Sequence, residues 1–293
     1  VVKNNYLIGR GANDMKSSIA CFLAAVSIFL KNKKKFNGSL SFLITGDEEA
    51  QAINGTKKVV DYLIKKKEKI DFCIVGEPTN PNKLGEMIKI GRRGSLSCNL
   101  ELQGTQGHVA YPHLSNNPIN SLITICEKLK KKPLDKGNKH FQPSNLEFTR
   151  IDVDNKAHNV IPARVKTQFN IRYNNFHTAV SLKKMINAEV KSICKKNKIK
   201  YKIEFLTSGN SFLTKPGATI QMAKKVINKI TKIKPVFSTT GGTSDARFIK
   251  KISPCLEFGL VNKTMHRVDE SVSLPDLKKL KKIYLSIIEN YFI

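Results

Sequence analysis

The chain has 293 residues, of which 51 are Lys or Arg and 23 are Asp or Glu, so its formal charge at pH 7 is +28. At roughly 150 residues per domain this length predicts two domains, and an apolar content of 40% excludes a mainly disordered chain. The longest apolar run, at 19–30, is shorter than the roughly 18 residues that a membrane-spanning helix needs. Composition therefore favours a globular protein.

The positive charge suggests a nucleic-acid partner, because a basic surface attracts phosphates. Most of the cations are Lys, however, and the sequence has no zinc-finger spacing and no RNP-type aromatic stretch. A basic nucleic-acid-binding protein is therefore only a distant alternative, and the same charge favours a small anionic substrate. The six cysteines are widely spaced without a CxxC motif, which predicts free thiols in a reducing, cytoplasmic compartment.

The first third of the chain alternates strand and helix patterns, which predicts an α/β layout. We expect strands at 6–9, 39–45 and 72–75, and helices at 17–30 and 55–66. Acidic residues follow each of these strands: Asp14, then Asp47, Glu48 and Glu49, then Glu77. Catalytic groups of α/β sheets gather beyond the carboxyl ends of the strands. These carboxylates are therefore predicted to lie at one site.

The middle of the chain has a different pattern. Strands are expected at 95–102, 146–153, 165–172 and 201–206, and helices at 118–129 and 178–194. This β-α-β-β-α-β order is that of a ferredoxin-like unit. The α/β pattern then resumes, with helices at 220–231, 245–250 and 275–291 and a strand at 255–259. We predict one α/β domain formed by 1–92 and 209–293, interrupted by an inserted ferredoxin-like domain at 93–208.

Each carboxylate also has a purely structural interpretation. Asp14 is suited to cap the helix that follows it, and Glu77, which precedes a proline, is suited to a plain turn. Together with the late His266, however, the carboxylates form a set of oxygen and imidazole donors. Such a set suits a pair of divalent metal ions, zinc in particular.

Motifs along the whole chain resemble, in order, those of the di-zinc aminoacylase and carboxypeptidase family of metallopeptidases. They are GRGANDMK at 9–16, GDEEA at 46–50, VGEPT at 75–79, IGRRGS at 90–95, QGHVAYPH at 106–113, NVIP at 159–162, GGTSDARF at 241–248 and MHRVDE at 265–270. The resemblance implies an α/β fold: a split di-zinc exopeptidase-like catalytic domain with an inserted ferredoxin-like dimerisation domain that also acts as a lid.

The resemblance implies a metal centre with named ligands. Asp14 is expected to bridge two Zn²⁺ (or Co²⁺) ions, with Glu77 on the first ion and Glu49 and His266 on the second. Glu48 is expected to be the general base, because it adjoins a ligand without being one. Relatives also carry an N-terminal His-x-Asp motif whose histidine completes the first site. No such motif occurs here, so we expect an incomplete first site in a fragment that is inactive or nearly so.

The same resemblance implies residues that bind the substrate. They are Arg92, Arg172, Asn159, Gly242, Thr243 and Ser244, and we expect the last four to lie close to the arginines. Arginine is rare in this chain, and its planar fork suits a carboxylate, although a surface ion pair is the structural alternative. His108 is expected to reach the active site of the partner subunit of a homodimer, formed through the inserted domain, and to stabilise the oxyanion there. His113, His140, His158 and His177 stay unassigned.

The resemblance implies metal-dependent amide hydrolysis as the reaction. The expected conversion is of N-succinyl-LL-2,6-diaminopimelate into succinate and LL-2,6-diaminopimelate, a step in the biosynthesis of lysine and diaminopimelate. An acetylornithine deacetylase, or another aminoacylase or dipeptidase of the same family, is the nearest alternative. Neither nucleic acid nor a membrane is expected as a partner.

Overall fold

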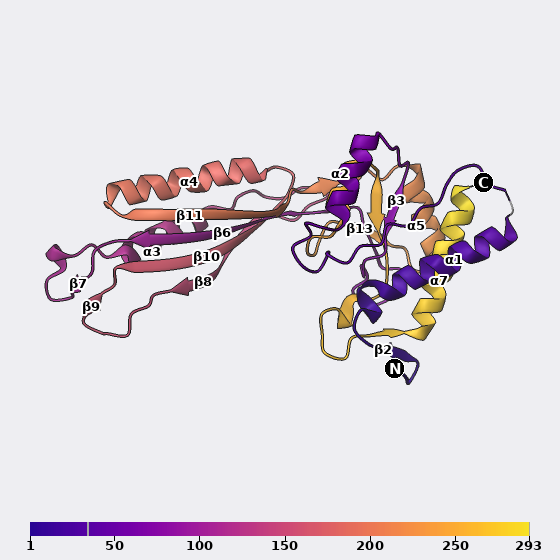
Figure 1. The fold of residues 1–293 in the computed structure, drawn as a ribbon, viewed down its shortest axis with the longest axis horizontal. Coiled ribbons are helices and arrows are strands. Elements are labelled where there is room, and N and C mark those ends of the chain that lie inside the picture. Colours follow the sequence, from indigo (N-terminus) through magenta and orange to yellow (C-terminus); the bar gives the residue numbers. More distant parts are fainter. Residues whose placement is uncertain (34, 293) are drawn as a thin grey trace. The chain divides into compact units, whose positions relative to one another are not determined.

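The computed structural model describes residues 1–33 and 35–292. These residues form two compact units (Figure 1). Unit 1 comprises the described residues of 1–91, 213–240 and 244–292, and unit 2 comprises 92–212 and 241–243. Unit 2 is therefore formed almost entirely by one insertion between segments of unit 1.

Unit 1 contains a mixed four-stranded sheet in the order β13-β4-β14-β3. β13 (Val236–Ser238) is parallel to β4 (Met87–Lys89), β14 (Cys255–Glu257) is parallel to β3 (Cys73–Val75), and β14 is antiparallel to β4. A second, antiparallel sheet has the order β1-β2-β15, with bounds Val2–Lys3, Tyr6–Ile8 and Ser271–Ser273. Its register pairs Ser271 with Ile8, so this sheet joins two segments that are far apart in the sequence.

The helices of unit 1 are α1 (Ser17–Asn32), α2 (Thr56–Lys66), α5 (Ala218–Thr231), α6 (Ala246–Ile249) and α7 (Leu274–Tyr291). α1 and α7 lie side by side in Figure 1, and the rings of Phe22 and Tyr284 stack with their centroids 3.6 Å apart. By length and composition alone, Ala12–Asn32 is the one helix of the described residues apolar enough to cross a membrane. Ala25 and Phe29 of this helix are buried in the core, so part of its apolar surface packs against protein.

One strand predicted for unit 1 is wrong. Residues 39–45 have no regular secondary structure, and Phe42, Leu43 and Ile44 are 43%, 41% and 59% exposed. Within the described residues no strand pairs with this segment. An apolar pattern favours a strand only where a neighbouring strand satisfies its backbone hydrogen bonds. The other helices and strands predicted for unit 1 are present close to their expected bounds, whereas the short strands β4, β13 and β15 were not predicted.

Unit 2 is built on an antiparallel sheet in the order β11-β6-β10-β8. Its elements are β6 (Gly94–Gln103), α3 (Pro118–Lys130), β8 (Asn145–Asp152), β10 (Arg164–Tyr173), α4 (Ala179–Lys196) and β11 (Lys200–Gly209). Side chains alternate along the strands, and the buried ones, such as Leu100 and Phe169, share a core with α3 and α4. This is the predicted β-α-β-β-α-β order, with the helices on one face of the sheet.

The remaining elements are short. They are η1 (Ala12–Lys16), β5 (Gly91–Arg92), β7 (Gly107–His108), η2 (Pro112–Leu114), β9 (Val160–Ile161), β12 (Phe212–Leu213) and η3 (Asn262–Thr264). Several residues singled out from the sequence lie in or next to these elements. All six cysteines are free, as their spacing predicted.

Candidate metal centre

Three loops of unit 1 bring together side chains that are suited to bind a metal ion. Asp14 lies in the irregular turn η1 between β2 and α1, and Glu49 lies in the loop before α2. His266 follows η3 and has a backbone φ of +59°, which is uncommon outside glycine. Because β2 and β15 are hydrogen-bonded neighbours, the sheet holds the turn of Asp14 beside the loop of His266.

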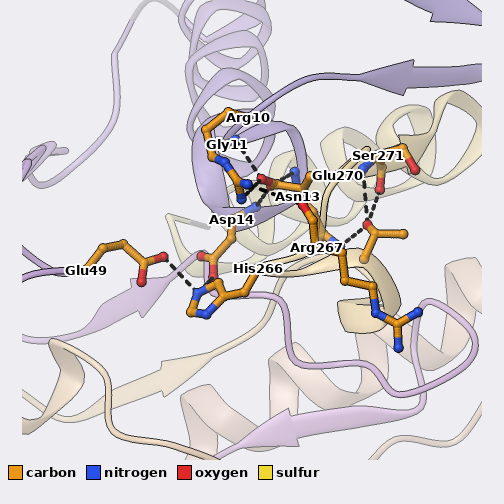
Figure 2. Close-up of polar contacts among 10 residues, drawn as sticks. Arg10, Gly11, Asn13, Asp14, Glu49, His266, Arg267, Glu270 and Ser271 are labelled. Atoms are coloured by element: carbon orange, nitrogen blue, oxygen red, sulfur yellow. Dashed lines mark hydrogen bonds and ion pairs between the residues drawn. The ribbon is translucent and has the colours of Figure 1, made fainter.

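The donor atoms of these three residues are close enough to share one cation. His266 Nε2 is 3.3 Å from Asp14 Oδ2 and 3.1 Å from Glu49 Oε1 (Figure 2), and all three donors lie within 4.8 Å of one another. The Asp14 side chain is 10% exposed, whereas those of Glu49 and His266 are 57% and 61% exposed. The cluster is therefore open to solvent on one side. Carboxylate oxygens and imidazole nitrogens are ligands that Zn²⁺ takes in proteins.

The charges of the cluster favour a bound cation. Burial and the Glu49 carboxylate raise the pKa of Asp14, against a lowering by His266 and by a hydrogen bond with Glu77. Burial opposes protonation of His266, but Glu49 and Asp14 raise the pKa of His266 above its ordinary value. Crowded carboxylates retain protons unless another cation relieves their repulsion, and a divalent ion does so. The residues present therefore fit a divalent metal.

The structural alternative for Asp14 does not hold. Helix α1 has Lys16 at its N-cap and no side-chain hydrogen bond there, so Asp14 is not the cap of that helix. Glu77 lies two residues after β3 and is half-buried, and a side-chain hydrogen bond with Glu77 is one of the causes that lower the pKa of Asp14. The two carboxylates expected at a first metal site thus lie next to each other.

Glu48 is half-buried beside the cluster. Burial, together with the negative charges of Asp245, Glu49 and Asp14, raises the pKa of Glu48 to about 7, and Arg247 opposes this rise. A carboxyl group that titrates near neutral pH both accepts and releases a proton readily at that pH. The environment of Glu48 is therefore suited to a general base that later acts as an acid.

Asp245 and Arg247 are candidate functional residues that our sequence reasoning did not single out. Arg247 Nη2 is 3.9 Å from Asp245 Oδ1, and both side chains are nearly buried. Arg247 Nη1 also donates to the Ser244 carbonyl oxygen at 3.3 Å. A signal was present, since both residues belong to the motif at 241–248 and arginine is rare in this chain. The charge of Asp245 raises the pKa of Glu48, whereas the charge of Arg247 lowers it.

The arginines expected to bind substrate lie in unit 2. Arg92 is 8% exposed and Arg172 is half-buried, and burial lowers the pKa of Arg172. Burial and the charge of Arg172 also lower the pKa of Arg93, whose Nη1 donates to Asn145 Oδ1 at 2.9 Å. A Cβ atom on Gly241 would lie 2.7 Å from Arg92 Nη1, and Gly241 has a φ of +97°, so glycine is required beside this guanidinium.

The glycine and hydroxyl residues of the motif at 241–248 differ in their accessibility. Gly242 is exposed, and a Cβ atom there would meet nothing within 4 Å. Thr243 is half-buried. Ser244 is buried, and its Oγ donates to Glu257 Oε1 at 2.8 Å. The Ser244 proton is therefore already used, and only its lone pairs remain for a substrate.

Within one chain, Asn159 does not lie close to Arg172. Asn159 lies next to His108 instead, because its carbonyl oxygen accepts from Val109 N at 3.0 Å and its Nδ2 is 3.5 Å from His108 Nε2. Arg172 pairs with Ser95 at one end of the β6-β10 ladder, and the chain after Asn159 enters β10 at the other end. The extended length of β10 separates the two sites.

An α/β unit with a carboxylate and imidazole cluster on its loops, interrupted by a ferredoxin-like unit, is the arrangement of a metal-dependent hydrolase. The sequence model of peptidase family M20/M25/M40 matches residues 1–290. The chain therefore belongs to this family of metallopeptidases. The family resemblance and the α/β class of the fold, with an exopeptidase-like catalytic domain, are confirmed.

Two relatives make the comparison more specific. The succinyl-diaminopimelate desuccinylase of Pelagibacter ubique (strain HTCC1062) is 65% identical over 291 residues, which are 99% of this chain and 76% of that protein. The protein of the same name from Wolbachia pipientis subsp. Culex pipiens (strain wPip) is 50% identical over 291 residues, covering 99% of this chain and 72% of that protein.

Solved structures share the fold at much lower identity. The aminopeptidase PepT of Bacillus cereus has a TM-score of 0.79 at 19% identity, over 99% of this chain and 75% of that one. The M20 family metallo-carboxypeptidase Sso-CP2 of Sulfolobus solfataricus has a TM-score of 0.76 at 18% identity, over 99% of this chain and 79% of that one. The fold is thus common to proteins whose named activities differ.

Proposed function

We propose that the protein is a metal-dependent amidohydrolase that converts N-succinyl-LL-2,6-diaminopimelate and water into succinate and LL-2,6-diaminopimelate, in lysine and diaminopimelate biosynthesis in the cytoplasm. The observation that carries the proposal is the cluster of Asp14, Glu49 and His266 in a chain that is 65% identical to a succinyl-diaminopimelate desuccinylase. A carboxylate and imidazole cluster suits a hydrolytic metal centre, and the relative's name supplies the substrate.

The proposed metal centre takes two Zn²⁺ or Co²⁺ ions per subunit. Asp14 and Glu77 would hold the first ion, and Asp14, Glu49 and His266 would hold the second. When bound, such ions polarise the amide carbonyl and make water more acidic. The donor distances around His266 and the hydrogen bond between Asp14 and Glu77 support this division.

Glu48 moves the proton in this reaction. Its carboxylate accepts a proton from the attacking water and passes it to the leaving amino group of diaminopimelate. The pKa of about 7 suits both steps at neutral pH. The negative charge of Asp245 raises the pKa of Glu48 and the positive charge of Arg247 lowers it, so the two charges together contribute to a value near neutral pH.

The carboxylates of the substrate bind to guanidinium and hydroxyl groups. Arg92 and Arg172 are buried or half-buried, and a charge-assisted bond from such a group is stronger than one formed in water. Gly242, Thr243 and Ser244 complete the substrate contacts. The net charge of +28 assists capture of an anionic substrate.

His108 and Asn159 act across a homodimer formed through unit 2. Both side chains are exposed and lie 3.5 Å apart at their nitrogen atoms. They therefore form a polar pair that is accessible to a second subunit. In the proposed dimer His108 donates to the oxygen that gains negative charge during hydrolysis.

The test compares substrates on the complete product of the gene, whatever its length, after loading with Zn²⁺. Release of succinate from N-succinyl-LL-2,6-diaminopimelate is measured against release of acetate from N-acetylornithine. We expect kcat/KM to favour the succinylated substrate by at least about 100-fold, because the arginines recognise its additional carboxylate. A preference for N-acetylornithine, or hydrolysis of dipeptides alone, would overturn the proposed substrate.

A further inference from the structure

Glu270 is a buried carboxylate that bonds to the turn carrying Asp14. Its side chain is 2% exposed, and both of its oxygens accept hydrogen bonds (Figure 2). Oε1 accepts from the backbone N–H groups of Asn13 at 2.7 Å and Asp14 at 2.8 Å. Oε2 accepts from the backbone N–H of Gly11 at 2.9 Å and from Arg10 Nη1 at 3.0 Å. All four bonds of Glu270 thus reach a single turn.

A second set of bonds joins this turn to the loop of His266. Asn13 Nδ2 donates to Thr264 Oγ1 at 3.0 Å and to the Val261 carbonyl oxygen at 2.8 Å. Thr264 Oγ1 in turn donates to the Ser271 carbonyl oxygen at 2.6 Å and accepts from Ser271 N–H at 3.2 Å. Thr264 therefore closes the loop that contains His266 and fastens it to the turn of Asp14.

The backbone around Asp14 needs these bonds. Asp14 has φ −120° and ψ 95°, which is not helical, so the regular i−4 hydrogen bonds do not hold this turn. Buried N–H groups require an acceptor, and an ionised acceptor makes stronger bonds than a neutral one. A single carboxylate that accepts bonds from three backbone N–H groups of this turn fixes the backbone from which the Asp14 side chain projects.

We propose that Glu270 is a positioning residue of the metal centre, which holds the Asp14 carboxylate at the distance from His266 that one divalent ion requires. This inference rests on the proposed metal centre. Glu270 is not itself a ligand in this account, because both of its oxygens are already directed at N–H donors. Thr264 helps to position the loop of His266, because it accepts from Asn13 in the turn of Asp14 and donates to Ser271.

The test measures Zn²⁺ affinity by competition with a chromophoric chelator in the complete gene product. Glu270→Gln keeps the size of the side chain but replaces one acceptor with a donor, and we expect it to weaken Zn²⁺ binding by about 10- to 100-fold. Asp269→Asn is the matched control, because Asp269 is the neighbouring carboxylate and is exposed. It is expected to change the affinity by less than about twofold. Equal affinity in the two variants would overturn the inference.

A spectroscopic measurement distinguishes a positioning role of Glu270 from a contribution to stability alone. With Co²⁺ in place of Zn²⁺, the visible absorption bands report the geometry of the ligands around the ion. We expect these bands to shift in folded Glu270→Gln and to stay unchanged in Asp269→Asn. A lower unfolding temperature in Glu270→Gln together with unchanged Co²⁺ bands would contradict a positioning role.

Two further variants keep the test decisive. If Asp14→Ala binds Zn²⁺ as tightly as the parent protein, the proposed metal centre and the role of Glu270 both fail. If Asp14→Ala loses Zn²⁺ while Glu270→Gln retains it, the metal centre stands and only the positioning role fails. Should Glu270→Gln not fold, Thr264→Val removes the Asn13 acceptor and leaves Glu270 in place. We expect it to weaken Zn²⁺ binding by about three- to tenfold, and unchanged affinity would contradict the inference.

Discussion

Arg172 of unit 2 lies on a long paired strand, whereas the candidate metal-binding residues of unit 1 lie on loops. β6 and β10 each span ten residues and are paired along their length. The strands of the mixed sheet in unit 1 span three residues each, and Asp14, Glu49 and His266 lie outside them. A long ladder fixes side-chain positions through backbone bonds alone. The loops of unit 1 need specific side-chain bonds, such as those of Glu270, to do the same.

The largest expected effect is a loss of turnover when the proposed general base in unit 1 is replaced. Glu48→Gln in unit 1 should lower kcat by about 10²- to 10⁴-fold, because the carboxylate that transfers the proton is lost. Zn²⁺ content should stay unchanged, measured by elemental analysis after dialysis. Glu49→Gln is the matched control and should lose metal. Loss of Zn²⁺ from Glu48→Gln would make Glu48 a ligand, and normal turnover would remove it from the mechanism.

The next effect concerns the core of unit 2. Phe169 is 1% exposed, so Phe169→Ala should lower the free energy of unfolding of this unit by about 3–5 kcal/mol. Hydrogen exchange of the β6 amides measures this loss locally. Zn²⁺ affinity should not change, because the cluster belongs to unit 1. A parallel loss of Zn²⁺ affinity would show that the loops of unit 1 depend on the core of unit 2.

A smaller effect is expected where unit 2 contributes to substrate binding. Arg172→Lys keeps the positive charge but removes the planar fork, and should raise KM by about 10- to 100-fold. Zn²⁺ content should be unaffected, which distinguishes this variant from changes in unit 1. Steady-state kinetics on the succinylated substrate measure the effect. An unchanged KM would mean that Arg172 does not contact the substrate.

The last expected effect is the pH dependence of metal binding. The pKa values of Asp14 and His266 are both raised, so protons compete with the metal at a higher pH than they would for unperturbed groups. Below the raised pKa of His266, Zn²⁺ affinity should fall by about tenfold per pH unit for each proton displaced. Chelator competition between pH 7 and pH 5 measures the slope. An affinity that is constant over this range would contradict the proposed ligands.

The sequence allowed most of unit 2 and the long helices of unit 1 to be predicted. β10 alternates between buried and more exposed residues over ten positions, and β6 does so from Leu96 onward. This period can be recognised in the sequence alone. β4 and β13 have only three residues each, too few to show a period. At 39–45 the apolar pattern was legible, but a strand also requires a partner.

The site was predicted less completely than the fold. Motifs nominated Asp14, Glu49 and His266, and the structure brings their donors together. Glu270 was part of a quoted motif but received no role, because its importance lies in backbone N–H groups that no residue pattern reveals. The separation of Asn159 from Arg172 within one chain could not be predicted, because it depends on the length and direction of β10.

The central claim is that the loops of unit 1 form a metal centre around Asp14. The most direct measurement is anomalous scattering at the zinc absorption edge from crystals of the complete gene product grown with Zn²⁺. The account predicts a strong peak among Asp14, Glu49 and His266, and a second peak on the Glu77 side of Asp14. Zinc peaks only at other positions, with these side chains unliganded, would contradict it.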